Sequence, residues 1–269
     1  MRLCFPVSSP ESDVNIMAMS GDFEDNVKYL AGLGYDGIEL MIRSPSIYLV
    51  EFVAQIMERY HMEIAAVGVT PIVLYDKLYI SSPSNLIRDK ALETAYKVID
   101  FASALSAPFC IGSFRGKISN DSGNELDDAM TAFKNINNYA KSKSVKVLVE
   151  PQGKSNSNYM NTFAEAEEFK AISGCDNLEF IFDMFHADNN ELDMFETLKA
   201  KSKDISLIHS SDRKRAQLGQ DTMPIDKIFA VLKTVKYSGW VSTEIKQYPD
   251  SKTAARLSYE YLDRMRKTT

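Results

Sequence analysis

A chain of 269 residues, with 45% hydrophobic and 25% charged side chains, can build a sizeable core and lacks the composition of disordered or fibrous proteins. Its formal net charge of −6 disfavours a polyanion, so we expect no nucleic-acid partner. The chain has three widely spaced cysteines, no apolar secretory leader and no apolar run of about 20 residues. These features predict a cytoplasmic protein without a membrane partner.

Short apolar runs alternate along the chain with longer amphipathic segments. Several runs are nearly continuous in Val, Ile, Leu and Phe, which is typical of strands that are buried on both faces in a parallel sheet covered by helices. We predict eight strands, at Arg2–Val7, Asp36–Leu40, Met62–Val69, Ala107–Ser113, Val145–Glu150, Leu178–Asp183, Asp204–His209 and Gly239–Glu244.

Helical periodicity and capping residues mark the intervening segments. Gly34 is a typical helix stop, Thr162 and Glu165 form a capping box, and Pro224 is typical of a first helical turn. We predict helices at Phe23–Leu33, around Phe52–Met57, and at Asn85–Ser106, Leu126–Lys143, Phe163–Ile172, Ile225–Val235 and Ala254–Met265.

Strand–helix units of roughly 35 residues predict an α/β fold, a single (β/α)8 TIM barrel spanning residues 1–269. The same periodicity is also compatible with an open doubly wound sheet. The first strand is not followed by a G-x-G-x-x-G turn, which weakens the case for dinucleotide binding.

The carboxyl ends of four successive predicted strands each carry an ionisable residue, and barrel enzymes build their sites at these ends. The four residues are Glu150, Asp183, His209 and Glu244. Each alone is typical of a helix cap or an ion pair, but four at one rim would repel unless a cation lay among them. Three carboxylates and one imidazole favour one hard or borderline divalent ion, Mn²⁺ foremost, with Mg²⁺, Co²⁺ and Zn²⁺ as alternatives.

Motifs around these residues resemble a known family. The segments EPQGKSNSNYMNT, FDMFHAD, IHSSDRKR and YSGWVSTEI stand where the xylose-isomerase-like sugar isomerase/epimerase superfamily has E-P-[LI]-N-R-Y-E-T-N-x-x-N-T, D-x-x-H, H-[IVL]-x-D-S-x-R and G-[YW]-x-G-x-[VL]-[ST]-x-E. The candidate ligands are 33, 26 and 35 residues apart, which resembles the spacing of ketose 3-epimerases of the D-tagatose 3-epimerase type. The similarity covers essentially the whole chain, including GLGYDGIEL at the second strand.

The resemblance implies specific roles. It implies metal binding by Glu150, Asp183, His209 and Glu244, and proton transfer by Glu150 and Glu244. One glutamate would remove the proton next to a sugar carbonyl, giving an enediolate that the metal stabilises. Return of the proton from the opposite face gives epimerisation, and transfer to the neighbouring carbon gives isomerisation. His186 and Arg215 would bind substrate oxygens, and the family implies a homo-oligomer with a small-molecule sugar substrate.

The chain departs from the family pattern in its expected substrate wall. Asn156 replaces the motif's second glutamate, residues 153–155 replace N-R-Y, and residues 218–221 replace a P-G-x-G turn. We expect Asn156 to contact the substrate, and Arg115, which follows the fourth strand, to bind an acidic or phosphorylated substituent. Glu39 is expected to be structural or to support the ligands. These features predict a substituted or acidic sugar.

Three alternatives remain. A keto-inositol or keto-sugar dehydratase would use the same metal and base. A DNA-repair hydrolase of the endonuclease IV type needs several more histidines than the three in this chain. A non-catalytic sugar-binding barrel would have no reason to keep all four ligands.

Overall fold

The computed structural model describes residues 1–12, 16–119 and 125–268, and within these ranges eight parallel strands form a closed barrel in chain order. Strand β8 pairs with β1 and closes the sheet. The predicted TIM barrel is therefore confirmed. The strands are β1 (Arg2–Ser8), β2 (Gly37–Met41), β3 (Glu63–Gly68), β4 (Phe109–Cys110), β5 (Val147–Val149), β6 (Leu178–Asp183), β7 (Ile205–Ser210) and β8 (Trp240–Thr243).

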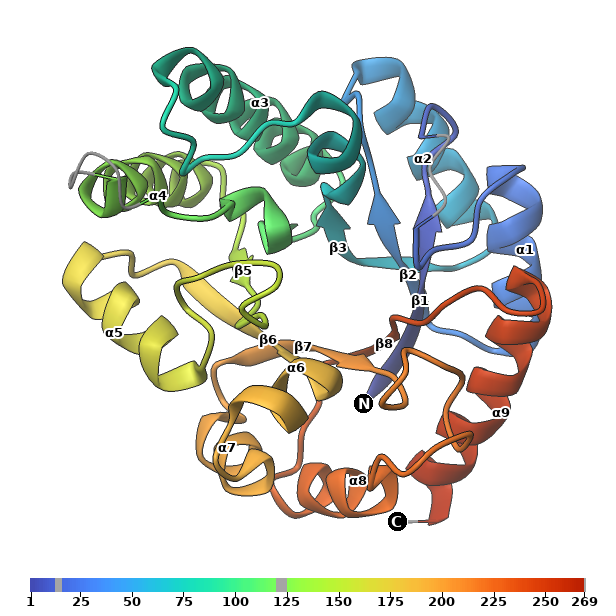
Figure 1. Ribbon diagram of the computed structural model, residues 1–269. Coiled ribbons are helices and arrows are strands. Elements are labelled where there is room, and N and C mark those ends of the chain that lie inside the picture. The colour runs from blue at the N-terminus through green and yellow to red at the C-terminus, as the bar shows by residue number, and fades with distance from the viewer. Residues whose placement is uncertain (13–15, 120–124, 269) are drawn as a thin grey trace.

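Helices surround the strands as a ring, in which the last helix lies beside the first (Figure 1). The helices are α1 (Phe23–Leu33), α2 (Ile47–Arg59), α3 (Asn85–Ala104), α4 (Glu125–Ser142), α5 (Phe163–Ser173), α6 (Met184–Asn190), α7 (Met194–Lys201), α8 (Ile225–Thr234) and α9 (Ser251–Thr268). Gly34 ends α1 with a left-handed φ of 104°, and Thr162 caps α5 by accepting from the Glu165 N–H, as predicted.

Two helices were not predicted, and several strands are shorter than predicted, β4 most of all. Helices α6 and α7 have seven and eight residues, too short for a clear apolar period, and each begins at an aspartate cap, Asp183 or Asp193. The predicted strand Ala107–Ser113 is shortened to β4, because the chain turns into a 3-10 helix at Gly112–Arg115.

The barrel strands carry a compact cluster of buried apolar side chains. Its members are Cys4, Ala65, Ala66, Cys110, Leu148, Ile181, Leu207 and Trp240. Gly37 permits this packing, because a Cβ there would lie 2.7 Å from the Trp240 ring and 2.4 Å from the Glu63 carbonyl oxygen. Over the described ranges, no helix combines the length and hydropathy that a membrane-crossing segment requires.

Candidate active site

Four ionisable side chains converge at the carboxyl ends of β5 to β8. Glu150 directly follows β5, Asp183 ends β6, His209 lies in β7 and Glu244 directly follows β8. The parallel register explains their common level, since Asp183 pairs with His209 and His209 pairs with Ser242. One ligand atom from each of the four side chains lies within 4.8 Å of the others. The structure thus brings together all four residues that the sequence analysis selected as metal ligands.

The two nitrogens of the His209 ring contact different groups. Its Nδ1 lies 3.1 Å from Glu150 Oε1, 3.4 Å from Glu244 Oε2 and 3.7 Å from Asp183 Oδ2. Its Nε2 lies 3.3 Å from the buried carboxylate of Glu39. Nδ1 is therefore the atom that faces the cluster. Glu39 can accept a hydrogen bond from the Nε2–H. This position agrees with the supporting role expected for Glu39.

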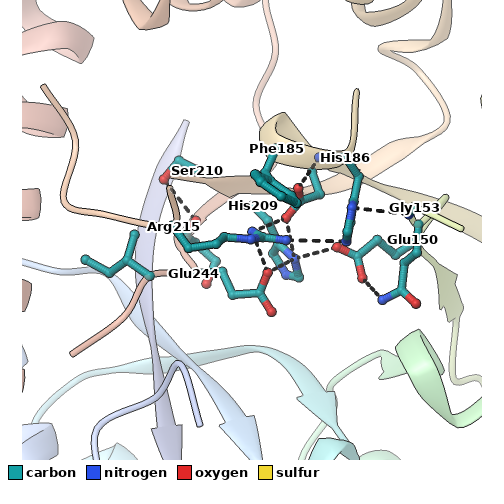
Figure 2. A network of polar contacts seen from close by, with 12 residues as sticks. Glu150, Gly153, Phe185, His186, His209, Ser210, Arg215 and Glu244 are labelled. Atoms are coloured by element: carbon teal, nitrogen blue, oxygen red, sulfur yellow. Dashed lines mark hydrogen bonds and ion pairs between the residues drawn. The ribbon is translucent and has the colours of Figure 1, made fainter. Parts of the chain in front are cut away.

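The guanidinium of Arg215 lies within this cluster. Its Nη1 lies 2.6 Å from Asp183 Oδ2 and 2.8 Å from Glu244 Oε2. Figure 2 shows the Arg215 guanidinium between Glu244 and His186, with the His209 ring close by. The loop that carries Arg215 is fixed to the segment after β8, because the Lys246 N–H donates to the Arg215 carbonyl at 2.8 Å.

These contacts shift the proton affinities of the cluster. Burial alone would raise the pKa of Asp183 and of Glu244, but the charge of Arg215 and the neighbouring His209 together outweigh burial and hold both pKa values below their ordinary range. Burial alone would lower the pKa of His209, whereas the carboxylates of Glu39 and Glu244 raise it well above its ordinary 6.5. The cluster therefore holds more negative charge than Arg215 neutralises.

The donor set fits one divalent cation. Counting Glu39, the cluster has four carboxylates and one guanidinium, an imbalance that a divalent ion reduces. Carboxylate oxygens with one imidazole nitrogen are ligands that Mn²⁺, Mg²⁺ and Co²⁺ accept. The second nitrogen of the candidate ligand His209 already lies beside Glu39, an arrangement that is usual for histidines that bind metals.

His186 is buried beside the cluster and can donate a hydrogen bond. Its Nδ1 accepts the Gly153 N–H at 3.2 Å, so in the neutral ring the proton lies on Nε2. That atom is 3.4 Å from Arg215 Nη2. Since both atoms carry hydrogen, this contact is a poor hydrogen bond, and the Nε2–H is available to an oxygen in the adjoining cavity.

Two connected cavities open above the cluster. The inner one, of about 120 Å³, is lined by Glu150, Asn156, His186, Arg215 and other residues of the barrel rim. The outer one, of about 550 Å³, is more apolar and is lined by Ile16, Met17, Met41, Thr70, Leu74, Glu244, Lys246, Gln247 and Tyr248. Met17, Met41, Thr70 and Glu244 border both cavities. The larger cavity of about 830 Å³ lies at the opposite end of the barrel, away from the ionisable cluster.

The comparison with protein families agrees with this architecture. A family model described as xylose isomerase-like TIM barrel matches residues 27–265. The chain belongs to this family. The family predicted from the motifs is thereby confirmed.

Individual relatives are distant. An L-ribulose 3-epimerase from Methylomonas sp. (strain DH-1) is 22% identical over 219 residues, which is 80% of this chain and 75% of the relative. A D-allulose 3-epimerase from Methylomonas sp. has a TM-score of 0.79 at 20% identity, over 98% of each chain. A 3-keto-D-glucoside 4-epimerase from E. coli has a TM-score of 0.81 at 17% identity, over 99% of each chain. At these identities the structural likeness establishes the fold.

Arg115 occupies a different environment from the one predicted. Its side chain has no exposed surface, and its guanidinium donates to the backbone carbonyls of Glu150 and Met160. Burial lowers its pKa. The expectation that Arg115 binds an acidic substituent is wrong for this geometry, because both terminal nitrogens are engaged by the main chain and neither cavity reaches it. It instead supports the segment that carries Glu150.

Asn156 lies where the substrate wall was expected. Its side chain is exposed, borders the inner cavity and accepts a hydrogen bond from Ser155 Oγ at 3.0 Å. Lys154 beside it is exposed as well. The contact between Asn156 and a substrate stays a prediction.

Gln152 is a site residue that the sequence analysis did not select. It is 5% exposed, borders the inner cavity and donates from Nε2 to Glu150 Oε2 at 2.5 Å. The signal was present in the motif, since Gln152 stands where E-P-[LI]-N-R-Y-E has an aliphatic residue. A polar side chain two positions after a candidate catalytic glutamate points to the same face of the segment.

Proposed function

We propose that this protein is a divalent-metal-dependent sugar epimerase or isomerase, which moves a proton at the carbon next to the carbonyl of a ketose or a substituted keto-sugar. The observation that carries the proposal is the convergence of four ligand atoms within 4.8 Å, two of them from glutamates on different strands. Glu150 arrives from β5 and Glu244 from β8, which are three strands apart in the barrel. The epimerase names of the distant relatives support the same reaction class.

The proposal assigns a separate chemical task to the metal, the two glutamates and the residues that bind substrate oxygens. A bound divalent ion, Mn²⁺ foremost, would supply charge stabilisation for the oxygens of the enediolate. In this proposal Glu150 and Glu244 are the base and acid, one removing the proton and the other returning it. The Nε2–H of His186 and the guanidinium of Arg215 hold substrate oxygens, since both border the inner cavity.

The cavities favour a substrate that extends beyond the reacting carbons. The inner cavity of about 120 Å³ is much smaller than the outer cavity of about 550 Å³, and four residues border both. The substrate would therefore reach into the apolar outer cavity, and a substituted keto-sugar fits this arrangement. An acidic substituent has weaker support, because Arg115 is buried and Arg215 is paired, which leaves Lys154 and Lys246 as the exposed lysines nearby.

Metal analysis and product analysis test the proposal together. Purified protein should contain one divalent ion per chain, chelation should abolish turnover of ketoses, and Mn²⁺ or Co²⁺ should restore it. Product formed in heavy water should carry deuterium at the reacting carbon when the proton exchanges with solvent. Full turnover by metal-free protein would refute the mechanism. A dehydrated product would instead establish the dehydratase, and ligand binding without turnover would establish a sugar-binding protein.

A further inference from the structure

The loop between β7 and α8 is folded around the side chain of Asp212. This loop covers residues 211–224, and Asp212 has no exposed surface. Its two carboxylate oxygens accept backbone N–H groups of the loop at distances between 2.8 and 3.1 Å, those of Arg213, Gln220, Asp221 and Met223. A carboxylate has about four acceptor sites, so the loop itself uses all of them. The carboxylate therefore determines the shape of the loop.

The main chain of Asp212 fixes Arg215 within this loop. The Asp212 carbonyl accepts the Arg215 N–H at 2.8 Å, and the Asp212 N–H donates to the Ala216 carbonyl at 3.2 Å. From outside the loop, the Lys246 N–H donates to the Arg215 carbonyl at 2.8 Å. Both main-chain polar groups of Arg215 are thus paired, one within the loop and one with the segment after β8.

Arg215 needs this support because its backbone conformation is unfavourable for a residue with a side chain. Its φ is 54°, in the left-handed region that non-glycine residues rarely occupy. Such a conformation persists only where the surrounding structure holds it. In this conformation the guanidinium lies 2.6 Å from Asp183 Oδ2 and 2.8 Å from Glu244 Oε2 (Figure 2). A relaxed loop would release both contacts.

We propose that Asp212 is a positioning residue, which holds the Arg215 guanidinium against the candidate ligand cluster through the main chain of the 211–224 loop. Asp212 borders neither the inner nor the outer cavity, so it acts on a bound sugar through Arg215. In the sequence it stands at the aspartate of the related motif H-[IVL]-x-D-S-x-R. The inference rests on the proposed function where it takes Arg215 to bind a substrate oxygen, whereas the hydrogen bonds of the loop do not depend on a substrate.

Amide hydrogen exchange tests the positioning role without a substrate. Asp212→Asn keeps the size of the side chain but turns an NH₂ group toward N–H donors, and Asp212→Glu displaces the carboxylate by one methylene. Asp221→Asn is the matched control, because Asp221 lies in the same loop and accepts from the neighbouring Thr222 N–H, which an amide can also do. The Lys246 N–H reports on the Arg215 carbonyl and has no bond to Asp212. In NMR of Mg²⁺-loaded protein it should exchange about tenfold or more faster in both Asp212 variants, and at the wild-type rate in the control.

Ketose affinity tests the consequence for the site. Calorimetry of Mn²⁺-loaded protein should show an affinity about tenfold or more lower in Arg215→Met, because a hydrogen bond from a charged donor is lost. Asp212→Asn should lower the affinity about fivefold or more, and Asp221→Asn should stay within about twofold of wild type. The double variant Asp212→Asn/Arg215→Met should bind within about twofold of Arg215→Met alone, because Asp212 acts through Arg215. Metal content is measured for every variant.

Each outcome has one meaning. Unchanged exchange at Lys246 in both Asp212 variants would overturn the positioning role, and so would faster exchange confined to the amides that the Asp212 carboxylate accepts. Additive losses in the double variant, or failure of both Asp212 variants to fold, would also overturn it, because Asp212 would then act by a route other than Arg215. Faster exchange at Lys246 in a protein that binds no ketose would refute the proposed function and leave the positioning of Arg215 established.

Discussion

Glu39 and the four candidate ligands contact opposite sides of the His209 ring. Nε2 lies 3.3 Å from the Glu39 carboxylate, and Nδ1 lies 3.1 Å from Glu150 Oε1. Ser242 Oγ of β8 donates to Glu39 at 2.8 Å, which fixes the carboxylate from across β1. A carboxylate that accepts from a histidine ligand sets the ring's tautomer and orientation and increases its basicity. Glu39 therefore orients His209 so that Nδ1 faces the four-residue cluster in which we propose that a cation binds.

This relationship predicts the effect of Glu39→Leu on metal binding. The affinity for Mn²⁺ or Co²⁺ should fall by about 10- to 100-fold, because His209 loses the acceptor that orients it. Glu39→Gln should have a smaller effect, since an amide carbonyl can still accept from Nε2–H. Calorimetric titration measures both, with Glu63→Gln on the opposite rim as the control. Wild-type affinity in Glu39→Leu would show that the contact is incidental.

The two candidate proton-transfer residues predict a large loss of turnover. Glu150→Gln and Glu244→Gln should each reduce turnover by about 100-fold or more, since positioned acid–base groups contribute at least that much. Each glutamine keeps a metal-binding oxygen, so metal content has to be measured for each variant alongside steady-state rates. Either variant retaining both its metal and the wild-type rate would remove that glutamate from the mechanism.

The cluster of candidate ligands could be predicted from sequence because each of these residues coincides with a strand end. Glu150, Asp183 and His209 end apolar runs and Glu244 ends the predicted strand Gly239–Glu244, and parallel strands in a barrel place such ends at one level. The positions of the strand ends in the sequence therefore also predict where these four side chains lie in the barrel. The barrel and the four-residue cluster follow from these positions.

The direction of loop side chains could not be predicted in this way. Arg115 lies one turn after β4, yet the left-handed Gly112 and the 3-10 helix direct its guanidinium into the protein, beneath the segment after β5. Gln152 donates a hydrogen bond to Glu150, and this contact depends on the conformation of the segment after β5. Sequence position identified the rim, but the backbone angles of irregular segments decide which rim residues face the cavity.

Burial of Arg115 predicts a structural phenotype. Arg115→Met leaves the carbonyls of Glu150 and Met160 without their donor, and each unpaired buried group costs about 1–3 kcal/mol. We therefore expect the free energy of unfolding to fall by about 2–5 kcal/mol in urea titrations of metal-free protein. Arg115→Lys should also be destabilising, because one ammonium group cannot reproduce the two-pronged contact. Unchanged stability together with weakened binding of acidic sugars would restore the original substrate-binding interpretation.

The buried thiol of Cys4 predicts a pH dependence of stability. Burial, and next to it the Glu39 charge, raises the pKa of Cys4 above its ordinary 9.0, so the folded state retains the thiol proton when the unfolded chain releases it. The resulting stability is complete below the unfolded pKa and is lost as the pH rises through and above 9. Urea titrations from pH 7 to 10.5 should show a steeper alkaline decline in wild type than in Cys4→Ala. Parallel curves would contradict the prediction.

Asn156 predicts the kind of sugar that the enzyme prefers. It borders the inner cavity where the related motif has a glutamate, so the chain has one negative charge fewer beside the substrate. Ser155 Oγ donates to Asn156 Oδ1, which leaves the amide NH₂ to donate to a ligand oxygen. We therefore expect substituted or acidic keto-sugars to have a higher kcat/KM than free ketohexoses. Asn156→Glu should lower kcat/KM for acidic substrates by about fivefold or more, the size of a like-charge contact at close range in water, and should spare neutral ones. The test is to measure kcat/KM for both substrate classes in wild type and variant. The expectation is refuted when wild type prefers free ketohexoses by about tenfold or more, a difference of about 1.4 kcal/mol.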